Sequence, residues 1–387
     1  MTVPRDDERF ARTALSCVTD PGDPVLGALL RACSPADVLA AICAGQAPQS
    51  LTAPWREQEH AMRSLSRALE RWAARLGYVP TESRITAWHR NGIRIVCPGD
   101  PEWPTQLDEL GDVRPVLLWV KGSTDLRYAC LRSVSVVGAR AATSYGSHVC
   151  AEMAAALAER GWTIISGGAY GIDSSAHRAA LAARGTTIAV LASGLSYGYP
   201  RGHSELFTAI AGSGALISEW PPDRAPTRPG FLIRNRLIAA ASRGTVVVEA
   251  ALRSGALSTA KHAFDLCRPL MAVPGPVTSM LSAGCHEIIR NRGAVLVTDA
   301  QDVVELISPA GDGLAEPRSG PAVPRDALDL ESAAVLEAVP ARGGRGPAEI
   351  AVAAGVGLDA VMRCLGLLAA AGFIERSDTG WRIQRKQ

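Results

Sequence analysis

The sequence predicts an α/β protein with a mainly parallel, doubly wound sheet, preceded by a helical domain and followed by a winged-helix-like domain. Short apolar segments alternate with helical segments between Val134 and Val297. Apolar residues recur at three- and four-residue spacing from residue 8 to about residue 76. Three short helical segments and a hairpin end the chain. The predicted domains are therefore residues 1–85, 86–307 and 327–387, with a linker at 308–326.

The first 85 residues are expected to form a small helical domain, of the SAM or helix-hairpin-helix type. Prolines and glycines separate its four helical segments. These segments are Arg9–Val18, Pro24–Ala32, Pro35–Ala44 and Trp55–Leu76. From Ile93 the pattern becomes that of short strands, at Ile93–Val96 and Val116–Trp119.

The central region alternates between strands and helices. The expected strands are short and apolar: Val134–Val137, Thr163–Ile165, Thr187–Leu191, Ala215–Ser218, Thr245–Val248, Leu270–Val273 and Ala294–Val297. The expected helices are Ser144–Arg160, Ser174–Ala183, Ser204–Ala211, Phe231–Ala241 and Ala256–Cys267. Because near-continuous apolar strands with helical crossovers indicate a parallel sheet covered on both faces, we expect ligands beyond the carboxyl ends of the strands.

The last 80 residues are expected to be a linker and a separate small domain. Residues 308–326 contain four prolines and three glycines without periodicity. Helices are predicted at Glu331–Val339, Pro347–Ala354 and Leu358–Ala371, and a hairpin at Phe373–Ile383. Because Arg363 is the only cation of the third helix, partner contact or weak duplex binding is favoured over sequence-specific readout of DNA.

The composition is that of a globular protein, with 47% hydrophobic and 20% charged residues and a net charge of +2. Nucleic acid would therefore have to meet a local gathering of cations. Nine cysteines without a CxxC pair indicate neither a zinc site nor a disulfide framework. No signal peptide is recognised and no apolar run is long enough to span a bilayer, so we expect a soluble, cytoplasmic protein.

Two glycine-containing turns follow expected strands. The first contains Gly138 and Arg140, and the second runs Ser166-Gly-Gly-Ala-Tyr-Gly-Ile-Asp173. A strand, a small-residue turn and a helix start can place backbone N–H groups around an anion, although Gly138 alone is more often an ordinary turn. Asp173 is interpreted as a helix cap, and His177 either contacts ligand or braces Asp173.

Cationic and aromatic residues gather in the following segments. Arg234, Asn235 and Arg236 interrupt an apolar helix, which is costly unless they meet anions or form ion pairs with Glu219 or Glu249. Tyr197, Tyr199, Arg201 and His203 combine rings and charge as single-stranded nucleic-acid sites do, or form a packed turn. Ser254–Lys261 is either an anion cradle or an ordinary helix start, and Glu249 is a possible general base without a visible partner.

Nucleotide-hydrolysis motifs are missing from the sequence. It contains neither the G-x-G-x-x-G fingerprint nor a G-x-x-x-x-G-K-[ST] P-loop. An acidic cluster for magnesium is also missing. NTP hydrolysis is therefore not expected, and no cofactor or metal is assigned.

Together these motifs resemble the DprA/Smf family of DNA-processing proteins. The resemblance covers residues 90–307 and lies in Val137-Gly-Ala-Arg140, Ser144-Tyr-Gly146, Ser166–Asp173 with Ala176-His177, Tyr199-Pro-Arg201, Ser218-Glu-Trp-Pro221, Phe231–Arg236, Val247-Val-Glu-Ala250, Ser254-Gly255 and Val273-Pro-Gly275. It implies an extended Rossmann-like core that dimerises, binds single-stranded DNA and hands it to the RecA recombinase in transformation or recombination, without catalytic turnover.

The resemblance also implies which residues bind DNA. They are Gly138, Arg140, Ser166, Gly167, Gly168, Tyr170, Gly171, Arg201, Arg234, Asn235 and Arg236, supported by Asp173, His177 and Glu249. Three positions depart from the family pattern: Tyr170 stands where arginine is usual, Ala139 replaces serine, and Leu232-Ile233 replace a pair containing proline.

A Rossmann-like nucleotide phosphoribohydrolase is the alternative function. Such hydrolases carry a P-G-G-x-G-T run near a catalytic glutamate. The corresponding stretch here, Arg253-Ser-Gly-Ala-Leu-Ser-Thr259, lacks the paired glycines.

Overall fold

The protein is described by a computed structural model covering residues 5–45, 59–309 and 323–384. The chain divides into two compact units, residues 1–315 and residues 316–387. The N-terminal helices belong to the first unit together with the sheet, and the boundary at residue 85 stays a prediction. Of the expected linker, residues 310–322 lie outside the described residues.

The N-terminal helices pack around one apolar cluster that contains Leu15, Ile42 and Trp72. The helices are α1 (Arg5–Val18), α2 (Pro24–Ala32), α3 (Pro35–Ala44), α5 (Glu59–Ala73), the 3-10 turn η2 (Leu76–Tyr78) and α6 (Glu82–Arg90). Asp23 and Ser34 cap α2 and α3, each directly before a proline at the first helical position. The first three helices begin and end within a few residues of their predicted bounds. Residues 55–58 of the fourth prediction lie outside the described part, and α6 was not predicted.

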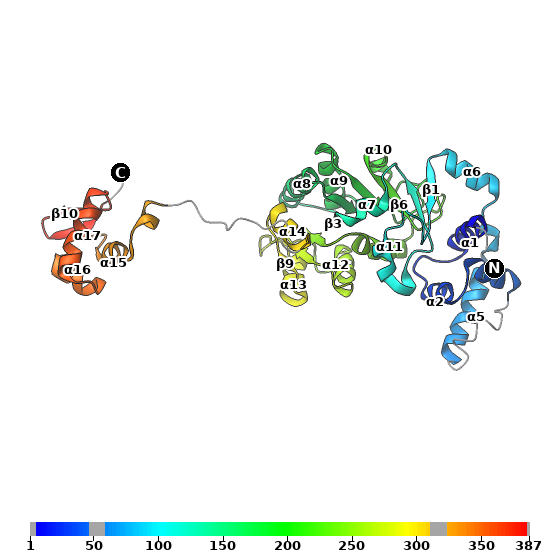
Figure 1. Cartoon of the computed structure of the whole chain (residues 1–387), viewed down its shortest axis with the longest axis horizontal. Coiled ribbons are helices and arrows are strands. Elements are labelled where there is room, and N and C mark those ends of the chain that lie inside the picture. The colour runs from blue at the N-terminus through cyan, green and yellow to red at the C-terminus, as the bar shows by residue number, and fades with distance from the viewer. Residues whose placement is uncertain (1–4, 46–58, 310–322, 385–387) are drawn as a thin grey trace. The chain divides into compact units, whose positions relative to one another are not determined.

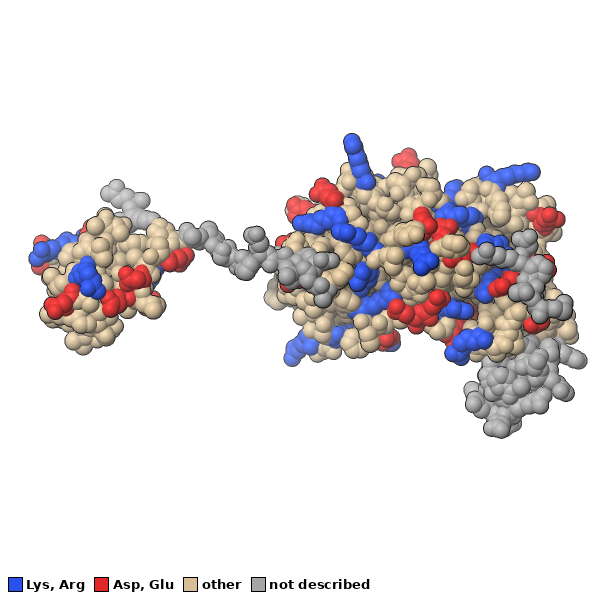
Figure 2. Space-filling view, viewed as in Figure 1, with Lys and Arg blue, Asp and Glu red and all other residues tan. Residues whose placement is uncertain are grey.

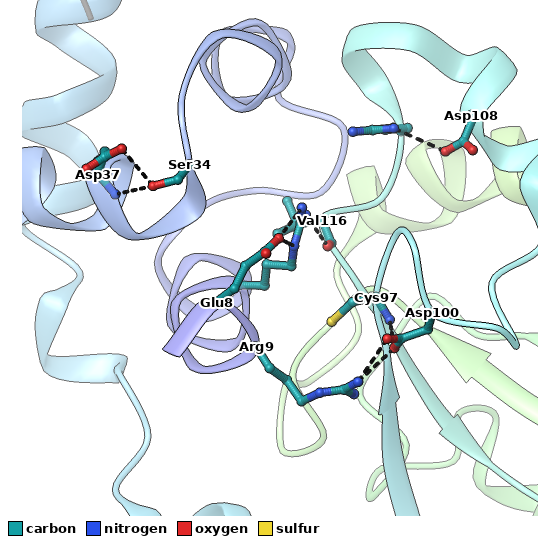
Figure 3. A network of polar contacts seen from close by, with 10 residues as sticks. Glu8, Arg9, Ser34, Asp37, Cys97, Asp100, Asp108 and Val116 are labelled. Carbon is teal, nitrogen blue, oxygen red and sulfur yellow. Dashed lines mark hydrogen bonds and ion pairs between the residues drawn. The ribbon is translucent and has the colours of Figure 1, made fainter. Parts of the chain in front are cut away.

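Charged side chains attach this helical layer to the edge of the sheet (Figure 3). Arg9 pairs with the Asp100 carboxylate at 2.9 Å. It also donates to the carbonyl oxygen of Ile95 at 2.8 Å. Arg12 donates to the carbonyl oxygen of Val116 at 3.2 Å and also pairs with Glu8. Because Ile95 belongs to an edge strand, Arg9 satisfies a backbone acceptor at the edge of the sheet.

The described residues of the first unit form one nine-stranded sheet. Its spatial order is β1-β2-β6-β5-β4-β3-β7-β8-β9. The strands are β1 (Ile93–Val96), β2 (Leu118–Lys121), β3 (Ser133–Val137), β4 (Thr163–Ser166), β5 (Thr187–Val190), β6 (Ala215–Ser218), β7 (Thr245–Val247), β8 (Leu270–Ala272) and β9 (Val295–Leu296). Strands β3 to β9 pair in parallel, whereas β2 pairs antiparallel with β1 and β6. The predicted parallel sheet is confirmed.

Helices cover both faces of the sheet (Figure 1). Val134 and Val136 of β3 pack with α8 (Ser144–Glu159), α9 (Ile172–Ala182) and α14 (Ala300–Ile307) on one face. Val137 faces the other way, into a cluster with α11 (Arg228–Ala241), α12 (Ala256–Asp265) and α13 (Ala283–Arg292). The remaining helical segments are η3 (Thr105–Val113), α7 (Leu126–Leu131), η4 (Arg201–His203) and α10 (Ser204–Ser213). Strands buried on both faces explain the near-continuous apolar runs of the sequence.

The order in which successive strands are added to the sheet reverses at β3. Strands β4, β5 and β6 lie on one side of β3, and β7, β8 and β9 lie on the other. The carboxyl ends of β3 and β7 therefore flank a topological switch point, where open α/β sheets bind their ligands.

The second unit contains the predicted three helices and hairpin. They are α15 (Leu330–Ala338), α16 (Pro347–Ala354), α17 (Leu358–Ala370), β10 (Ile374–Ser377) and β11 (Gly380–Ile383), preceded by the 3-10 turn η5 (Pro324–Ala327). Ser377 pairs with Gly380, which leaves Asp378 and Thr379 as a two-residue turn. Val335, Ile350, Leu365 and Ile374 form its core.

Across residues 5–45, 59–309 and 323–384, no single helix is both long and apolar enough to cross a membrane, although two bent helix pairs reach that length and composition together.

Candidate nucleic-acid interface

A cavity of about 740 Å³ lies at the switch point of the sheet. Its walls are the turn after β3, the segment after β7, and the first turns of α11 and α12. On the face of the molecule seen in Figure 2, cationic and anionic side chains are interspersed. This face therefore shows no single large basic surface among its coloured residues, and the local geometry of the cavity carries the argument.

Three exposed arginines line this cavity: Arg140 after β3, Arg228 at the start of α11 and Arg253 after β7. The Arg140 guanidinium carbon lies 5.0 Å from the centre of the Phe231 ring. The Tyr199 ring also contacts Phe231, edge-on, with the ring centres 5.7 Å apart. These five residues come from four segments of the chain and place positive charge and aromatic surface around one opening, which we call the cavity rim.

Arg234 forms part of the cavity wall but is only 6% exposed. It donates to the carbonyl oxygen of Gly167 at 2.7 Å and also to that of Val190. A side chain at Gly167 would displace the Arg234 guanidinium from this position. Burial lowers the pKa of Arg234 to about 10, opposed by the nearby Asp173. Arg234 thus joins the ends of β4 and β5 beneath the cavity.

The neighbouring predicted residues are also buried. Asn235 donates from Nδ2 to the carbonyl oxygen of Gly255 at 3.2 Å and fixes the start of α12. Arg236 is 4% exposed and makes a two-pronged ion pair with Glu219, with both N–O distances 2.6 Å. Its Nε donates to the carbonyl oxygen of Val113 at 2.9 Å. The sequence left two roles open for Arg236, contact with DNA or an ion pair with Glu219 or Glu249. The structure shows the ion pair with Glu219.

The two glycine-containing turns pack against each other. A side chain at Gly138 would collide with Ile172, and one at Gly171, whose φ is +78°, would collide with the carbonyl oxygens of Ala139 and Arg140. The Ile172 N–H donates to the Ala139 carbonyl at 3.1 Å. These glycines therefore permit close backbone packing behind the rim.

The remaining loop residues are less accessible than a ligand site requires. The Ser166 hydroxyl donates to the carbonyl oxygen of Val136 at 2.6 Å and is fully buried. Gly168 is buried as well, and its carbonyl lies 3.0 Å from Nδ1 of His203. Ser166 and Gly168 thus shape the loop from within.

The interpretation of Asp173 as the cap of its helix is wrong. Gly171 occupies the N-cap position of α9, and Asp173 lies in the first turn. The buried Asp173 carboxylate instead accepts from the Ala169 N–H at 3.4 Å, and burial raises the pKa of Asp173. Asp173 stabilises the glycine loop, because its partner is a loop N–H rather than a helix N–H, and it also lines the cavity.

His177 and Glu249 are also held inside the protein. The Nδ1 atom of His177 lies 2.7 Å from the Thr187 hydroxyl, and burial lowers the pKa of His177 to about 3. His177 is not among the residues that line the cavity, and its hydrogen-bond partner is Thr187 rather than Asp173. Glu249 accepts from the Thr143 N–H at 2.9 Å and from the Thr143 hydroxyl at 2.6 Å. Both carboxylate oxygens of Glu249 thus accept hydrogen bonds from Thr143, the N-cap residue of α8.

Arg201 and Tyr170 lie outside the cavity lining. Both are exposed, and Tyr170 contacts the His203 ring edge-on with centres 4.4 Å apart. A side chain at Gly202 would meet the Tyr170 hydroxyl. Tyr170, Arg201 and His203 therefore form a second cationic and aromatic group, beyond the glycine loop.

The sequence indicated that five arginines could converge at one edge of the sheet: Arg140, Arg201, Arg228, Arg234 and Arg236. Of these, Arg140, Arg228 and Arg234 line the cavity. Arg253, which also lines it, was missed by sequence reasoning. The signal that could have found Arg253 is its position between the end of a strand and the start of α12.

Comparison with known proteins places the fold and these motifs in one family. The family model for DNA recombination-mediator protein A matches residues 94–308. The DprA homologue of Mycobacterium tuberculosis is 42% identical over 96% of this chain and 93% of its own length. Protein Smf of Escherichia coli is 42% identical over 56% of this chain and 58% of its own length.

Solved structures agree with this comparison. The crystal structure of DNA processing protein A from Streptococcus pneumoniae matches with a TM-score of 0.62 and 29% identity, covering 80% of this chain and 99% of that one. The Helicobacter pylori protein matches with a TM-score of 0.50 and 30% identity, covering 55% of this chain and 94% of that one. The chain belongs to the DNA recombination-mediator protein A family, the DprA/Smf proteins of DNA processing.

Proposed function

We propose that this protein binds single-stranded DNA at the cavity rim and acts in DNA recombination or transformation. The observation that carries the proposal is the convergence of Arg140, Arg228 and Arg253 with the Tyr199–Phe231 pair at the switch point. The Helicobacter pylori relative binds single-stranded DNA. Membership of the same family supports the same ligand here.

The rim suits a single strand better than a duplex. Arginine forks bind phosphate oxygens, and base–aromatic stacking contributes about 1–3 kcal/mol per base in such sites. The rings of Tyr199 and Phe231 can stack only on bases that are unpaired. The exposed Tyr170 and Arg201 give the strand a second cationic and aromatic group to follow. Tyr170 replaces the family's arginine there and supplies a ring instead of a charge.

We further infer that the protein binds DNA without catalytic turnover. A phosphoribohydrolase needs a carboxylate free to act as a base, and Glu249 stands nearest to the corresponding motif. Both of its oxygens are engaged by Thr143, and Glu249 is 2% exposed. Incubation with nucleoside monophosphates, followed by chromatography of free bases, tests this inference; release of base would restore the hydrolase.

Fluorescence anisotropy of a labelled oligonucleotide tests the proposed ligand. The wild-type protein is expected to bind a single strand more tightly than the matching duplex, with affinity that falls linearly on logarithmic axes as salt rises. Equal affinity for the single strand and the duplex, or an affinity that does not change with salt, would contradict the proposal that DNA binds at the cavity rim.

We propose RecA recombinase as the partner that receives the strand, on the strength of family membership. The expected result is faster RecA assembly on a strand already coated by single-strand-binding protein. The lag before RecA's ATP hydrolysis measures this step. An unchanged lag at saturating protein would leave DNA binding intact and reject the transfer.

We also propose that the protein is a homodimer. Strand β9 ends the sheet order, and Val295 and Leu296 on it are exposed apolar residues. Open strand edges with apolar side chains pair readily with another chain. Sedimentation analysis is expected to give a dimer for the wild type and a monomer for Leu296→Lys. A dimer that survives this substitution would move the interface elsewhere.

A further inference from the structure

The third helix of the C-terminal unit presents an apolar face to solvent. Leu358, Met362, Gly366 and Ala370 are spaced by four along α17, so they share one side of the helix, and all four are exposed. Leu358 is 50% exposed and Met362 is 54% exposed. The opposite side of α17 holds the unit's core with Val361, Leu365 and Leu368. None of the four residues of this apolar face belongs to the core cluster of the unit.

Charge on the same helix disfavours DNA as the occupant of this face. Arg363 is the only cation among the residues of α17, and it pairs with Glu331 at 2.9 Å. Residues 323–387 contain seven arginines, one lysine and eight carboxylate side chains, so this part of the sequence has no excess of positive charge. Duplex binding draws on several unpaired cations that meet phosphates. A DNA backbone near α17 would instead meet the Asp359 carboxylate and Arg363, which is paired with Glu331.

The remaining chemistry favours a cationic protein partner. An apolar stripe beside a carboxylate, Asp359, fits an amphipathic helix whose apolar side is flanked by lysine or arginine. A second copy of the same face would bring two Asp359 carboxylates together, which opposes self-association through it.

We propose that α17 is a docking face for a basic, amphipathic helix of a partner protein. The face comprises Leu358, Met362, Gly366 and Ala370, with Asp359 as its charged margin. This surface is separate in the chain from the DNA-binding rim. If the docking proposal failed, the proposed DNA binding would therefore be unaffected. Different variants test the docking face and the DNA-binding rim.

A labelled peptide provides the test with the full-length chain. The probe is a leucine–lysine peptide of about 18 residues, five helical turns, with leucines at helical spacing. A permuted peptide of identical composition is the control. The helical peptide is expected to bind at least about tenfold more tightly than the permuted one, since only it gathers the leucines on one side.

Four variants locate the site. Met362→Lys is expected to weaken peptide binding about tenfold or more, and Met362→Leu to leave it unchanged, since only the first places charge on the apolar face. Asp359→Lys is expected to weaken it several-fold. The same charge change at Asp378, in the turn between β10 and β11, is expected to have no effect. Because all these positions are exposed, folding is preserved, and circular dichroism checks it.

Three outcomes would overturn the proposal. The first is wild-type peptide binding by both Met362→Lys and Asp359→Lys. The second is a concentration-dependent dimer that Met362→Lys dissociates, which would make a second copy the occupant. The third is duplex DNA binding that Arg363→Ala abolishes, which would make α17 a DNA-reading helix.

Discussion

Replacing Arg140 and Arg253 together by alanine is expected to weaken binding of a single-stranded oligonucleotide by on the order of 100-fold at moderate salt. The two arginines lie on different walls of the cavity, one after β3 and one after β7. Each is exposed and free to meet a separate phosphate without moving the sheet. Loss of each contact is also expected to reduce the slope of log affinity against log salt by about 0.7.

The matched control is Arg160→Ala with Arg243→Ala. Both arginines are exposed. They lie before the amino ends of β4 and β7, whereas the cavity lies beyond the carboxyl ends of the strands. The control changes the net charge equally, so a general electrostatic effect would weaken both double variants alike. Anisotropy titrations at three or more salt concentrations separate the two cases.

An equal loss in both variants would mean that DNA responds to the protein's overall charge. Undiminished binding in both would move the interface to other parts of the chain. A loss of affinity without any change in salt slope would also contradict the prediction, because it would show that Arg140 and Arg253 shape the cavity without touching phosphate.

Tyr199 and Phe231 explain why the rim was only partly predictable from the sequence. Tyr199 was recognised because it lies in a loop already rich in rings and charge. Phe231 was expected to be an ordinary apolar residue of its helix. Only the fold brings its ring within 5.0 Å of Arg140, which is distant in the chain. Proximity across elements is a tertiary property that spacing along the sequence does not encode.

The strands were predictable because burial on both faces leaves a strong local signal. β3 and β4 match their predicted spans to within one residue, since apolar and β-branched residues fill them. Helices α13 and α14 were missed. α14 begins shortly after β9, and its N-cap is Asp299, whose carboxylate accepts from the N–H groups of Gln301 and Asp302. That cap is visible in the sequence and could have located α14.

Arg236→Met is expected to lower the free energy of unfolding of the first unit by about 3–5 kcal/mol, because it leaves the Glu219 carboxylate buried without its partner. The Arg236 and Glu219 side chains are 5% and 6% exposed. Denaturant titration followed by tryptophan fluorescence measures the loss, and Trp220 lies directly beside Glu219.

An exposed ion pair serves as the control for this substitution. Arg31 pairs with Asp112 at 2.9 Å, with 63% of the Arg31 side chain exposed. Because water screens this pair, Arg31→Met is expected to cost at most about 1 kcal/mol. A similar cost for both substitutions would mean that the Arg236–Glu219 pair contributes no more than a surface contact.

Combining Arg236→Met with Glu219→Met decides between a structural and a DNA-binding role for Arg236. With both charges removed, no carboxylate remains buried alone, so much of the lost stability is expected to return. If Arg236 acts only through Glu219 and Val113, the double variant should bind single-stranded DNA within about threefold of the wild type, a difference under 1 kcal/mol. If it regains stability but has lost DNA affinity, Arg236 must leave its ion pair and reach the strand. The helix bearing Arg228 at its start would then contribute charge from its interior as well as from its end.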